Sequence, residues 1–302
     1  MSTRPTNEPD CRDETADRAV DLVIAGRPRS VGSFTVSRLL PFAKRRMVGP
    51  FVFVDHMGPV DIAPGAGFDV PPHPHIGLST LTYFLAGENV HRDSLGTVQV
   101  NRPGDVNLMT AGRGVVHSER ADPAWRARGG AMHGVQIWLA LPEANEEDAP
   151  SFAHHPQATL PVFASGGVQG RVLAGTAFGA SSPLRHPSAP LLVDLELAPG
   201  ASIELPDAEE RGVFVIEGRI HIGAELVTSD QLAVVTPGRR TITAEVSTRA
   251  LLLGGPHLGA RFIDWNFVAS SRDRIDRARA AWKARRFPEI PTDHDEFVPD
   301  PG

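Results

Sequence analysis

The stretch "LSTLTYFLAGENVHRDSLGTVQVNRPGDVNLMTAGRGVVHSER", residues 78–120, decides the fold class. It contains five short apolar segments separated by the turn sequences AGEN, SLG, NRPGD and AGRG. Strands of about five residues joined by such turns are typical of a β-sandwich or barrel. Apolar segments on either side, FVFVDHMGPV (51–60) and HGVQIWLALP (133–142), add further strands. We therefore predict an all-β protein.

The second half of the chain repeats this pattern. The hairpin YFLAGENVHRD (83–93) resembles VFVIEGRIHIG (213–223), and NRPGDVNLMTAG (101–112) resembles VTSDQLAVVTPG (227–238). Such internal similarity indicates two copies of one β-domain. The acidic connector EANEEDAPS (143–151) suits the boundary between them. We predict a flexible tail over residues 1–19, a first domain over 20–145 and a second over 146–302.

The end of the chain has a helical pattern instead. In SSRDRIDRARAAWKARRF (270–287), a serine is followed three residues later by Asp273, and Pro288 stops the pattern. Ile275, Ala278 and Trp282 recur at helical spacing. We predict a helix over about 271–286. Its arginines are expected to form a solvated face beside an apolar seam, in preference to an anion site.

Composition excludes several classes of protein. The 302 residues are 41% hydrophobic and 22% charged, which is ordinary for a globular protein. No apolar run approaches the roughly 18–20 residues that span a membrane, and the N-terminal sequence has no secretory signal. The single cysteine, Cys11, cannot form an internal disulfide, so we expect a cytoplasmic protein. A net charge of −6 argues against direct binding of nucleic acid.

The segment PPHPHIG (71–77) contains the first candidate metal ligands. His73 and His75 are separated by one residue, so both imidazoles point to the same side of an extended strand. The neighbouring prolines disfavour helix and support that extended conformation. Taken alone, such a pair is more typical of a metal-free surface loop.

The segment GVVHSER (114–120) offers a second pair. His117 and Glu119 are again separated by one residue, on a predicted strand that follows the AGRG turn. Two such pairs in one β-domain can converge inside a barrel. Three histidines and one glutamate suit Fe, Mn, Co, Ni, Cu or Zn, and they leave one or two coordination positions open for catalysis.

The spacing of these residues resembles the two cupin motifs. Gly67-x5-His73-x-His75-x4-Thr80-x6-Gly87 is similar to the first motif, with Thr80 in the position of the usual glutamate. The second motif, beginning at Gly104, has Thr110 in place of proline, and its histidine comes two residues late. A shift of two keeps His117 on the same strand face, so Glu119 can supply the missing carboxylate.

This variant, together with FVFVDHMGPV, TAGRGVVHSER and the terminal DWNFVASSRDRIDRARAAWKARRFP (264–288), resembles the pirin family. The resemblance implies two tandem cupin (jelly-roll β-barrel) domains, with metal ligands at His73, His75, His117 and Glu119. Pirins carry no ligands in their second domain, and the matching positions here are Glu204 and Pro206. We therefore expect one divalent transition metal. Fe(II) is the first expectation, with Mn, Co, Ni, Cu and Zn as alternatives.

One departure concerns Ile76, because many pirins read H-P-H-R-G and carry arginine there. An arginine beside a ligand would add charge near the metal and influence its redox potential. Ile76 removes that charge.

The resemblance also implies a function. Bacterial pirins include quercetin 2,3-dioxygenases, in which a flavonol binds the metal, Glu119 accepts the 3-hydroxyl proton as general base, and O2 opens the ring with release of carbon monoxide. The alternatives are a non-catalytic metal or redox sensor that binds a regulatory protein partner, and a different cupin enzyme. We expect a small aromatic substrate, no membrane association and a monomer.

Other polar residues have simpler interpretations. His91 is expected in a polar hairpin more than at the mouth of a pocket, and Asp55 is expected to cap a turn. His56 and Met57 fit either a pocket wall or the core. His133 is expected to be a strand histidine bonded to the backbone more than a residue beside the metal. The remaining histidines, His154, His155, His186, His221, His257 and His294, show no pairing that indicates a site.

Overall fold

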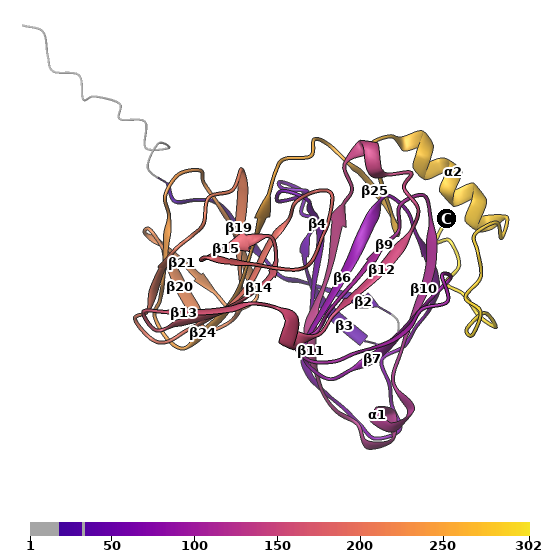
Figure 1. Cartoon of the computed structure of the whole chain (residues 1–302), viewed down its shortest axis with the longest axis horizontal. Coiled ribbons are helices and arrows are strands. Elements are labelled where there is room, and N and C mark those ends of the chain that lie inside the picture. Colours follow the sequence, from indigo (N-terminus) through magenta and orange to yellow (C-terminus); the bar gives the residue numbers. More distant parts are fainter. Residues whose placement is uncertain (1–17, 32–33) are drawn as a thin grey trace, which may run out of the picture.

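The computed structural model describes residues 18–31 and 34–302. The five strands predicted in residues 78–120 are all present, as β6 (Leu78–Ala86), β7 (Asn89–Asp93), β8 (Val98–Asn101), β9 (Val106–Thr110) and β10 (Val115–Arg120). The all-β fold class is confirmed, as is a helix near the C-terminus. Two barrel-like domains lie side by side, with the helix at the far end of the first (Figure 1).

The first domain is built from a large and a small sheet. The large sheet has seven strands in the order β12-β9-β6-β11-β4-β3-β2. The five of these not yet given bounds are β12 (Ser151–His155), β11 (Gly130–Ala140), β4 (Phe51–Ile62), β3 (Phe34–Leu40) and β2 (Arg27–Val31). The small sheet has the order β5-β10-β7-β8, with β5 at Val70–His75. A short helix, α1 (Pro123–Arg128), is capped by Asp122 and joins β10 to β11.

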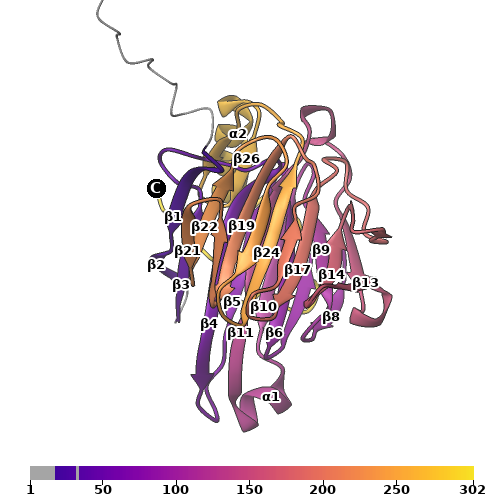
Figure 2. The ribbon, with the colours of Figure 1, turned by 90° about the vertical axis from the view of Figure 1, so that its left-hand side faces the viewer.

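The second domain repeats this plan. Its large sheet has the order β1-β22-β19-β24-β17-β14-β13, and Figure 2 shows these strands side by side. Their bounds, in the same order, are Val20–Ala25, Gln231–Val235, Glu210–Glu217, Thr248–Gly255, Leu191–Leu197, Val168–Ala174 and Val162–Ser165. Its small sheet has the order β18-β23-β20-β21, with bounds Ser202–Glu204, Thr241–Ala244, Arg219–Ile222 and Glu225–Thr228. Strand for strand, β5 and β10 of the first small sheet correspond to β18 and β23 of the second.

The remaining elements are short connectors. They are the 3-10 turns η1 (Glu143–Asn145) and η2 (Gln157–Thr159), the hairpin of β15 (Thr176–Ala177) and β16 (Ala180–Ser181), and the hairpin of β25 (Phe262–Asp264) and β26 (Phe267–Ala269). The turn η1 lies in the acidic connector that follows the first domain.

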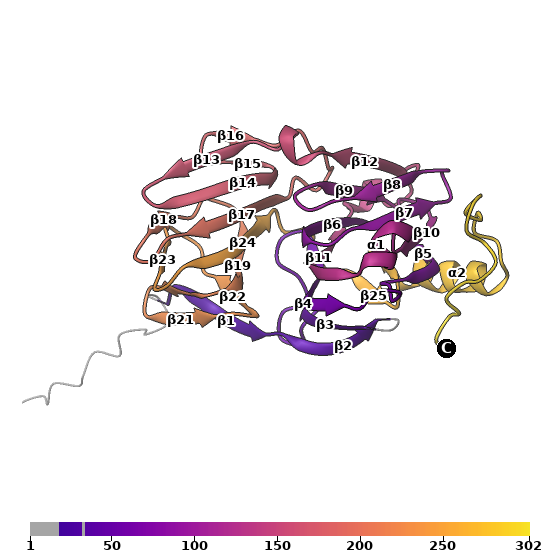
Figure 3. The same cartoon turned by 90° about the horizontal axis from the view of Figure 1, so that it is seen from below.

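The sheets do not follow the predicted bounds of 20–145 and 146–302. Strand β1 pairs with β22 of the second domain, and β12 pairs with β9 of the first, so each domain receives its outermost strand from beyond the predicted boundary (Figure 3). The C-terminal helix also returns to the first domain. The physical reason is that an unpaired sheet edge exposes N–H and C=O groups, and the other part of the chain supplies the missing strand.

The two large sheets pack back to back, because alternate residues of each strand face the partner sheet. On β6, Leu81 and Tyr83 face the interface, whereas Thr80 and Phe84 face the inside of the first barrel. The interface core contains Leu39, Val54, Leu81, Ile137 and Leu139 from the first domain with Leu173, Leu192, Phe214, Leu232 and Leu253 from the second.

The C-terminal helix, α2 (Arg272–Lys283), packs on the hairpin β25–β26 at the side of the first barrel away from the second domain. Its buried seam of Ile275, Ala278 and Trp282 is the predicted one. The N-cap is Ser271, whose hydroxyl accepts from the Arg274 N–H, and not the preceding serine. Ser270 instead donates its N–H and hydroxyl to the buried Glu146 carboxylate, which ties the start of the helix to the connector after the first domain.

Ile76 lies in this same apolar cluster. It is fully buried and packs with Val116, Phe267, Ile275 and Trp282. An arginine side chain here would have to bury its charge beneath α2, so the isoleucine is explained by the apolar seat of the helix.

The predictions about the N-terminal tail and about membrane-spanning segments can be compared with the structure only over the described residues. Most of the predicted tail, and Cys11 within it, lie outside the described residues. Among the described residues, no helix is both long enough and apolar enough to cross a membrane.

Candidate metal centre

The first two candidate ligands lie on β5, at the edge of the small sheet. This strand contains Pro71, Pro72 and Pro74, which an edge strand tolerates because one side of its backbone needs no ladder hydrogen bonds. His73 and His75 alternate with the prolines, so both imidazoles point into the barrel, with ring centroids 5.0 Å apart. The prolines therefore favour the extended backbone that aims both rings at one point.

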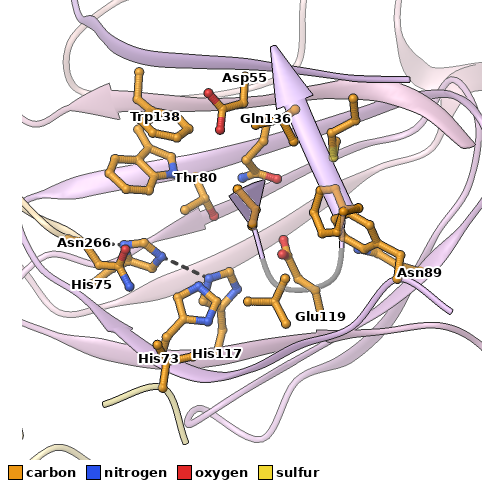
Figure 4. A pocket seen from close by; sticks show the side chains of 18 of the residues that line it. Asp55, His73, His75, Thr80, Asn89, His117, Glu119, Gln136, Trp138 and Asn266 are labelled. Atoms are coloured by element: carbon orange, nitrogen blue, oxygen red, sulfur yellow. Dashed lines mark hydrogen bonds between the residues drawn. The ribbon is translucent and has the colours of Figure 1, made fainter. Parts of the chain in front are cut away.

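The third ligand reaches this point through the pairing of β5 with β10. His117 lies directly opposite His73 in the antiparallel register, and their ring centroids are 4.3 Å apart. One ring nitrogen from each of His73, His75 and His117 lies within 4.8 Å of the other two. All three side chains are buried, and Figure 4 shows their rings gathered at one end of a cavity.

The outer ring nitrogens of two of these histidines are held by the backbone. His73 Nδ1 lies 2.9 Å from the Pro71 carbonyl oxygen, and His75 Nδ1 lies 2.8 Å from that of Asn266. A carbonyl only accepts, so each Nδ1 carries the hydrogen and each Nε2 presents a lone pair. Burial lowers the pKa of His73 to about 4 and holds the pKa values of His75 and His117 well below the usual range. All three imidazoles are thus neutral, the form that binds metal.

The inner nitrogens fit one divalent ion. His75 Nε2 lies 3.1 Å from His117 Nε2. Two nitrogens bound at right angles to one ion, each about 2.1 Å from it, are separated by about 3 Å. Three imidazoles without thiolates suit a transition metal and leave further positions open. The residues present therefore fit the metal that the family resemblance implies.

Glu119 lies in the same cavity, outside the group of three. A register shift between His117 and Glu119 accompanies the proline-rich segment of β5, and the Glu119 side chain projects into the cavity (Figure 4). It is 9% exposed, and burial raises the pKa of its carboxyl group to about 7. The structure thus brings His73, His75 and His117 together and places Glu119 beside them as an available carboxylate.

The cavity has a volume of about 470 Å³. Thr80, which occupies the position of the usual cupin glutamate, lines it. Apolar side chains make up much of the wall, with Phe53 stacked on Trp138 at 4.0 Å between centroids. Further apolar lining residues include Val31, Phe34, Val36, Met57, Phe68 and Phe84. This wall suits a flat aromatic ligand.

An ion pair between the partly exposed Arg38 and the buried Asp55 lies across the cavity from the histidines. Arg38 Nε and Nη2 each donate to Asp55 at 2.8 Å, and Figure 4 shows Asp55 and Gln136 opposite His73 and His117. The predicted role of Asp55 as a turn cap is wrong, because β4 continues through it as a regular strand. The alternation in FVFVDHM places Phe53, Asp55 and Met57 on one strand face, and this pattern indicates that Asp55 faces the cavity with the other two.

The prediction of His91 as a polar hairpin residue was also wrong. It is buried on β7, stacked on Phe152 with centroids 4.6 Å apart, and its Nδ1 lies 3.4 Å from His117 Nδ1. The pairing of Glu119 with His91 across β10 and β7 brings it inside the barrel. Its spacing of two from Asp93 indicates that the two side chains lie on the same strand face, where they can bond to each other.

His56 and His133 lie away from the metal centre, at the domain interface. Their Nε2 atoms are 3.0 Å apart, and His56 Nδ1 is 3.3 Å from Asp230 Oδ1 of the second domain. His133 is therefore bonded to a side chain and not to the backbone, contrary to expectation.

The two positions of the second domain that match His73 and His75 in the sequence are occupied by residues with other contacts. Glu204 lies at the surface in an ion pair with Arg239, and the carbonyl of Pro206 accepts from Arg211.

The chain resembles proteins of known family along most of its length. The Pirin family model matches residues 33–139, and the model of the Pirin C-terminal cupin domain matches residues 192–288. A pirin-like protein of Caulobacter vibrioides is 48% identical over 288 residues, which are 93% of this chain and 99% of that protein. A Pseudomonas aeruginosa protein with the provisional name quercetin 2,3-dioxygenase is 42% identical over 89% of this chain and 85% of its own length.

Solved structures agree with this assignment. A quercetin 2,3-dioxygenase from Acinetobacter baumannii superposes with a TM-score of 0.86 and 35% identity, covering 93% of this chain and 95% of that one. A bacterial pirin from Escherichia coli, solved in complex with nickel(II), shares the fold with a TM-score of 0.62 at 23% identity, over 78% of this chain and 99% of that one.

Proposed function

The chain belongs to the pirin family, and on that premise we propose that it is a metal-dependent oxygenase of the quercetin 2,3-dioxygenase type, acting on a flavonol-like substrate. The observation that carries the proposal is the convergence of His73, His75 and His117 at one end of an aromatic-walled cavity of about 470 Å³. A cavity of this size suits a ligand of three rings. The names of the relatives support the same substrate class.

In this proposal His73, His75 and His117 hold one divalent ion, with Fe(II) as the first expectation and Glu119 as the fourth ligand. A bound ion supplies Lewis acidity that lowers the pKa of a coordinated hydroxyl group. The nickel(II) bound by the Escherichia coli pirin makes nickel a second metal to test.

The side chains of the cavity then have separate tasks. Glu119, buried among them, would accept the proton of the substrate 3-hydroxyl as general base when it is not bound to the ion. Phe34, Phe68 and Trp138 hold the flat rings and exclude water. The Arg38–Asp55 pair lies at the opposite side, where it can bond the hydroxyl groups of the distal ring. The overall reaction takes one flavonol and one O2 to a depside and carbon monoxide.

The test is aerobic turnover of quercetin by protein loaded separately with Fe, Mn, Co, Ni or Cu. Loss of flavonol absorbance together with release of carbon monoxide is the expected result. Absence of both with every metal would refute the flavonol oxygenase. No residue described above favours the alternative of a metal-sensing regulator with a protein partner.

A matched pair of variants tests the role of Glu119. Glu119→Gln keeps the size of the side chain and the three imidazoles but removes the base, so turnover should fall by roughly 100-fold or more while metal is retained. Glu204→Gln, which changes an exposed carboxylate of the second domain, should leave turnover unchanged. Equal rates for wild type and Glu119→Gln would show that Glu119 is not the base.

A further inference from the structure

The third metal-binding histidine is supported differently from the other two. The outer nitrogens of His73 and His75 face backbone carbonyl oxygens, which can only accept a hydrogen bond. The outer nitrogen of His117 faces another ring nitrogen, His91 Nδ1, at 3.4 Å. An imidazole nitrogen can either donate or accept, so the contact alone does not decide which nitrogen of His117 carries the hydrogen.

The buried Asp93 determines which ring nitrogen of His91, and therefore of His117, carries the hydrogen. His91 Nε2 lies 3.0 Å from Asp93 Oδ2, and the carboxylate is fully buried. The other oxygen, Oδ1, accepts the N–H groups of Leu95 and Thr97 at 2.9 and 3.0 Å, which fixes the carboxylate in the turn after β7. An ionised carboxylate only accepts, so His91 Nε2 carries the hydrogen and His91 Nδ1 presents a lone pair.

The tautomer of His117 follows from that of His91. Because His91 Nδ1 accepts, His117 Nδ1 donates, and His117 Nε2 is left with its lone pair directed at the metal position, 3.1 Å from His75 Nε2. The opposite tautomer would place a hydrogen on Nε2, where the ion must bind. The ring of His91 is itself held in place by stacking on Phe152, a residue of the strand that comes from beyond the predicted boundary.

We propose that Asp93 and His91 form a hydrogen-bonded relay that positions His117 and fixes its metal-binding tautomer. Asp93 and His91 are positioning residues, since neither belongs to the group of three histidines. Partners of metal-bound histidines typically change metal affinity about 10- to 100-fold when they are altered. This inference rests on the proposed metal centre and does not depend on the substrate.

Two variants separate the relay from the packing around it. Asp93→Asn keeps an oxygen for the Leu95 and Thr97 amides but offers an N–H group to His91, which inverts the relay and places the hydrogen on His117 Nε2. His91→Phe keeps an aromatic ring against Phe152 but removes the acceptor for His117. The control is His154→Gln, because His154 lies in the same barrel and bonds Asn107 away from the metal-binding group.

The experiment titrates each metal-free protein with Co(II) in competition with a chelator and records the visible absorption of the bound ion. Circular dichroism and the thermal midpoint of the metal-free proteins verify folding. We expect both relay variants to bind Co(II) about 10- to 100-fold more weakly, with an altered spectrum, and the control to match wild type.

The outcomes distinguish two failures. Wild-type affinity and spectrum in both folded relay variants would overturn the relay and leave the metal centre in place. Equal weakening in the control would also overturn the relay, since the effect would then be general to histidines of this barrel. Failure of the wild type to bind Co(II) would overturn the metal centre itself and the relay with it.

Discussion

The strands that carry the three candidate ligand histidines have direct counterparts in the second domain, and the two pairs differ in what they place inside the barrel. On β5 and β10, His73 lies opposite His117, and both rings point inward. On β18 and β23, the inward pair is Ile203 opposite Ile242, whereas Ser202 and Thr243 bond to each other outside at 2.8 Å. The same pair of strands therefore serves a polar centre in one domain and an apolar core in the other.

The interiors differ accordingly. The first barrel encloses a cavity of about 470 Å³ with polar groups at both ends. The second is filled by a continuous apolar cluster that includes Val193, Leu195, Val213, Ile220, Ile242 and Leu252. A barrel of this size can be filled by side chains or hold one small ligand. The inward-facing residues determine whether such a barrel is filled by side chains or encloses a cavity.

The second domain nevertheless contributes to the candidate metal centre through the chain that follows it. After β24, the chain returns to the first barrel, where the Asn266 carbonyl holds His75 and Trp265 lines the cavity. Further on, Val298 donates its N–H to the Pro72 carbonyl of β5, and Asp293 accepts from Arg120 of β10. The strands that carry the ligands are thus fastened by the end of the chain.

The largest expected effect tests whether only one of the two strand pairs binds metal. His117→Ala should reduce the bound metal from about one ion per chain to nearly none, because two imidazoles remain of the group. Thr243→Ala, on the corresponding strand β23, should leave the metal content at the wild-type level. Elemental analysis of the purified proteins measures both, and an unchanged content in His117→Ala would disprove the centre.

The next effect tests the difference between the filled and the hollow barrel. Leu195→Ala, on β17 in the filled barrel, should lower the free energy of unfolding by about 2–5 kcal/mol, because it leaves a cavity in close-packed surroundings. Met57→Ala, on the corresponding strand β4, should cost less, because one side of Met57 already faces a cavity. Urea denaturation of the metal-free proteins compares the two. Equal losses would mean that the first barrel is as well packed as the second.

The smallest effect concerns the interface between the domains. His186 of the second domain bonds Ser79 of the first at 2.9 Å, and burial lowers the pKa of His186 to about 4. An unfolded histidine has a pKa of about 6.5, so between these values only the unfolded state gains the proton. The stability contributed by neutral His186 is therefore present above about pH 6.5 and is lost as the pH falls toward 4.

The corresponding measurement is urea denaturation of the metal-free protein at about pH 7.5 and about pH 5.5. His186→Gln cannot gain a proton, so it should lose roughly 1 kcal/mol less stability than wild type between these two conditions. If wild type and variant lose the same amount, His186 is not the buried neutral group described.

Much of the fold could be predicted because it depends on local patterns. Turn residues marked all five strands of residues 78–120, and period-two alternation placed His73, His75 and His117 on inward faces. The apolar spacing of Ile275, Ala278 and Trp282 predicted the buried face of α2. In each case the information lies within one strand or one helix.

Other features depend on contacts between distant segments. The exchange of β1 and β12 between the domains follows from sheet edges that only the assembled sheets expose. His91 became a partner of His117 through the pairing of β7 with β10. Its spacing from Asp93 shows only that the two side chains share a strand face, and not which histidine they lie against.

The sequence by itself determined the two-domain β architecture and the three histidines on inward strand faces, because strand alternation and turn chemistry act over a few residues. Only the tertiary structure decided that Glu119 lies beside the group and not within it, that Arg38 and Asp55 face it across a cavity, and that the chain end holds His75. These are matters of register and packing between strands far apart in the sequence, and no local pattern records them.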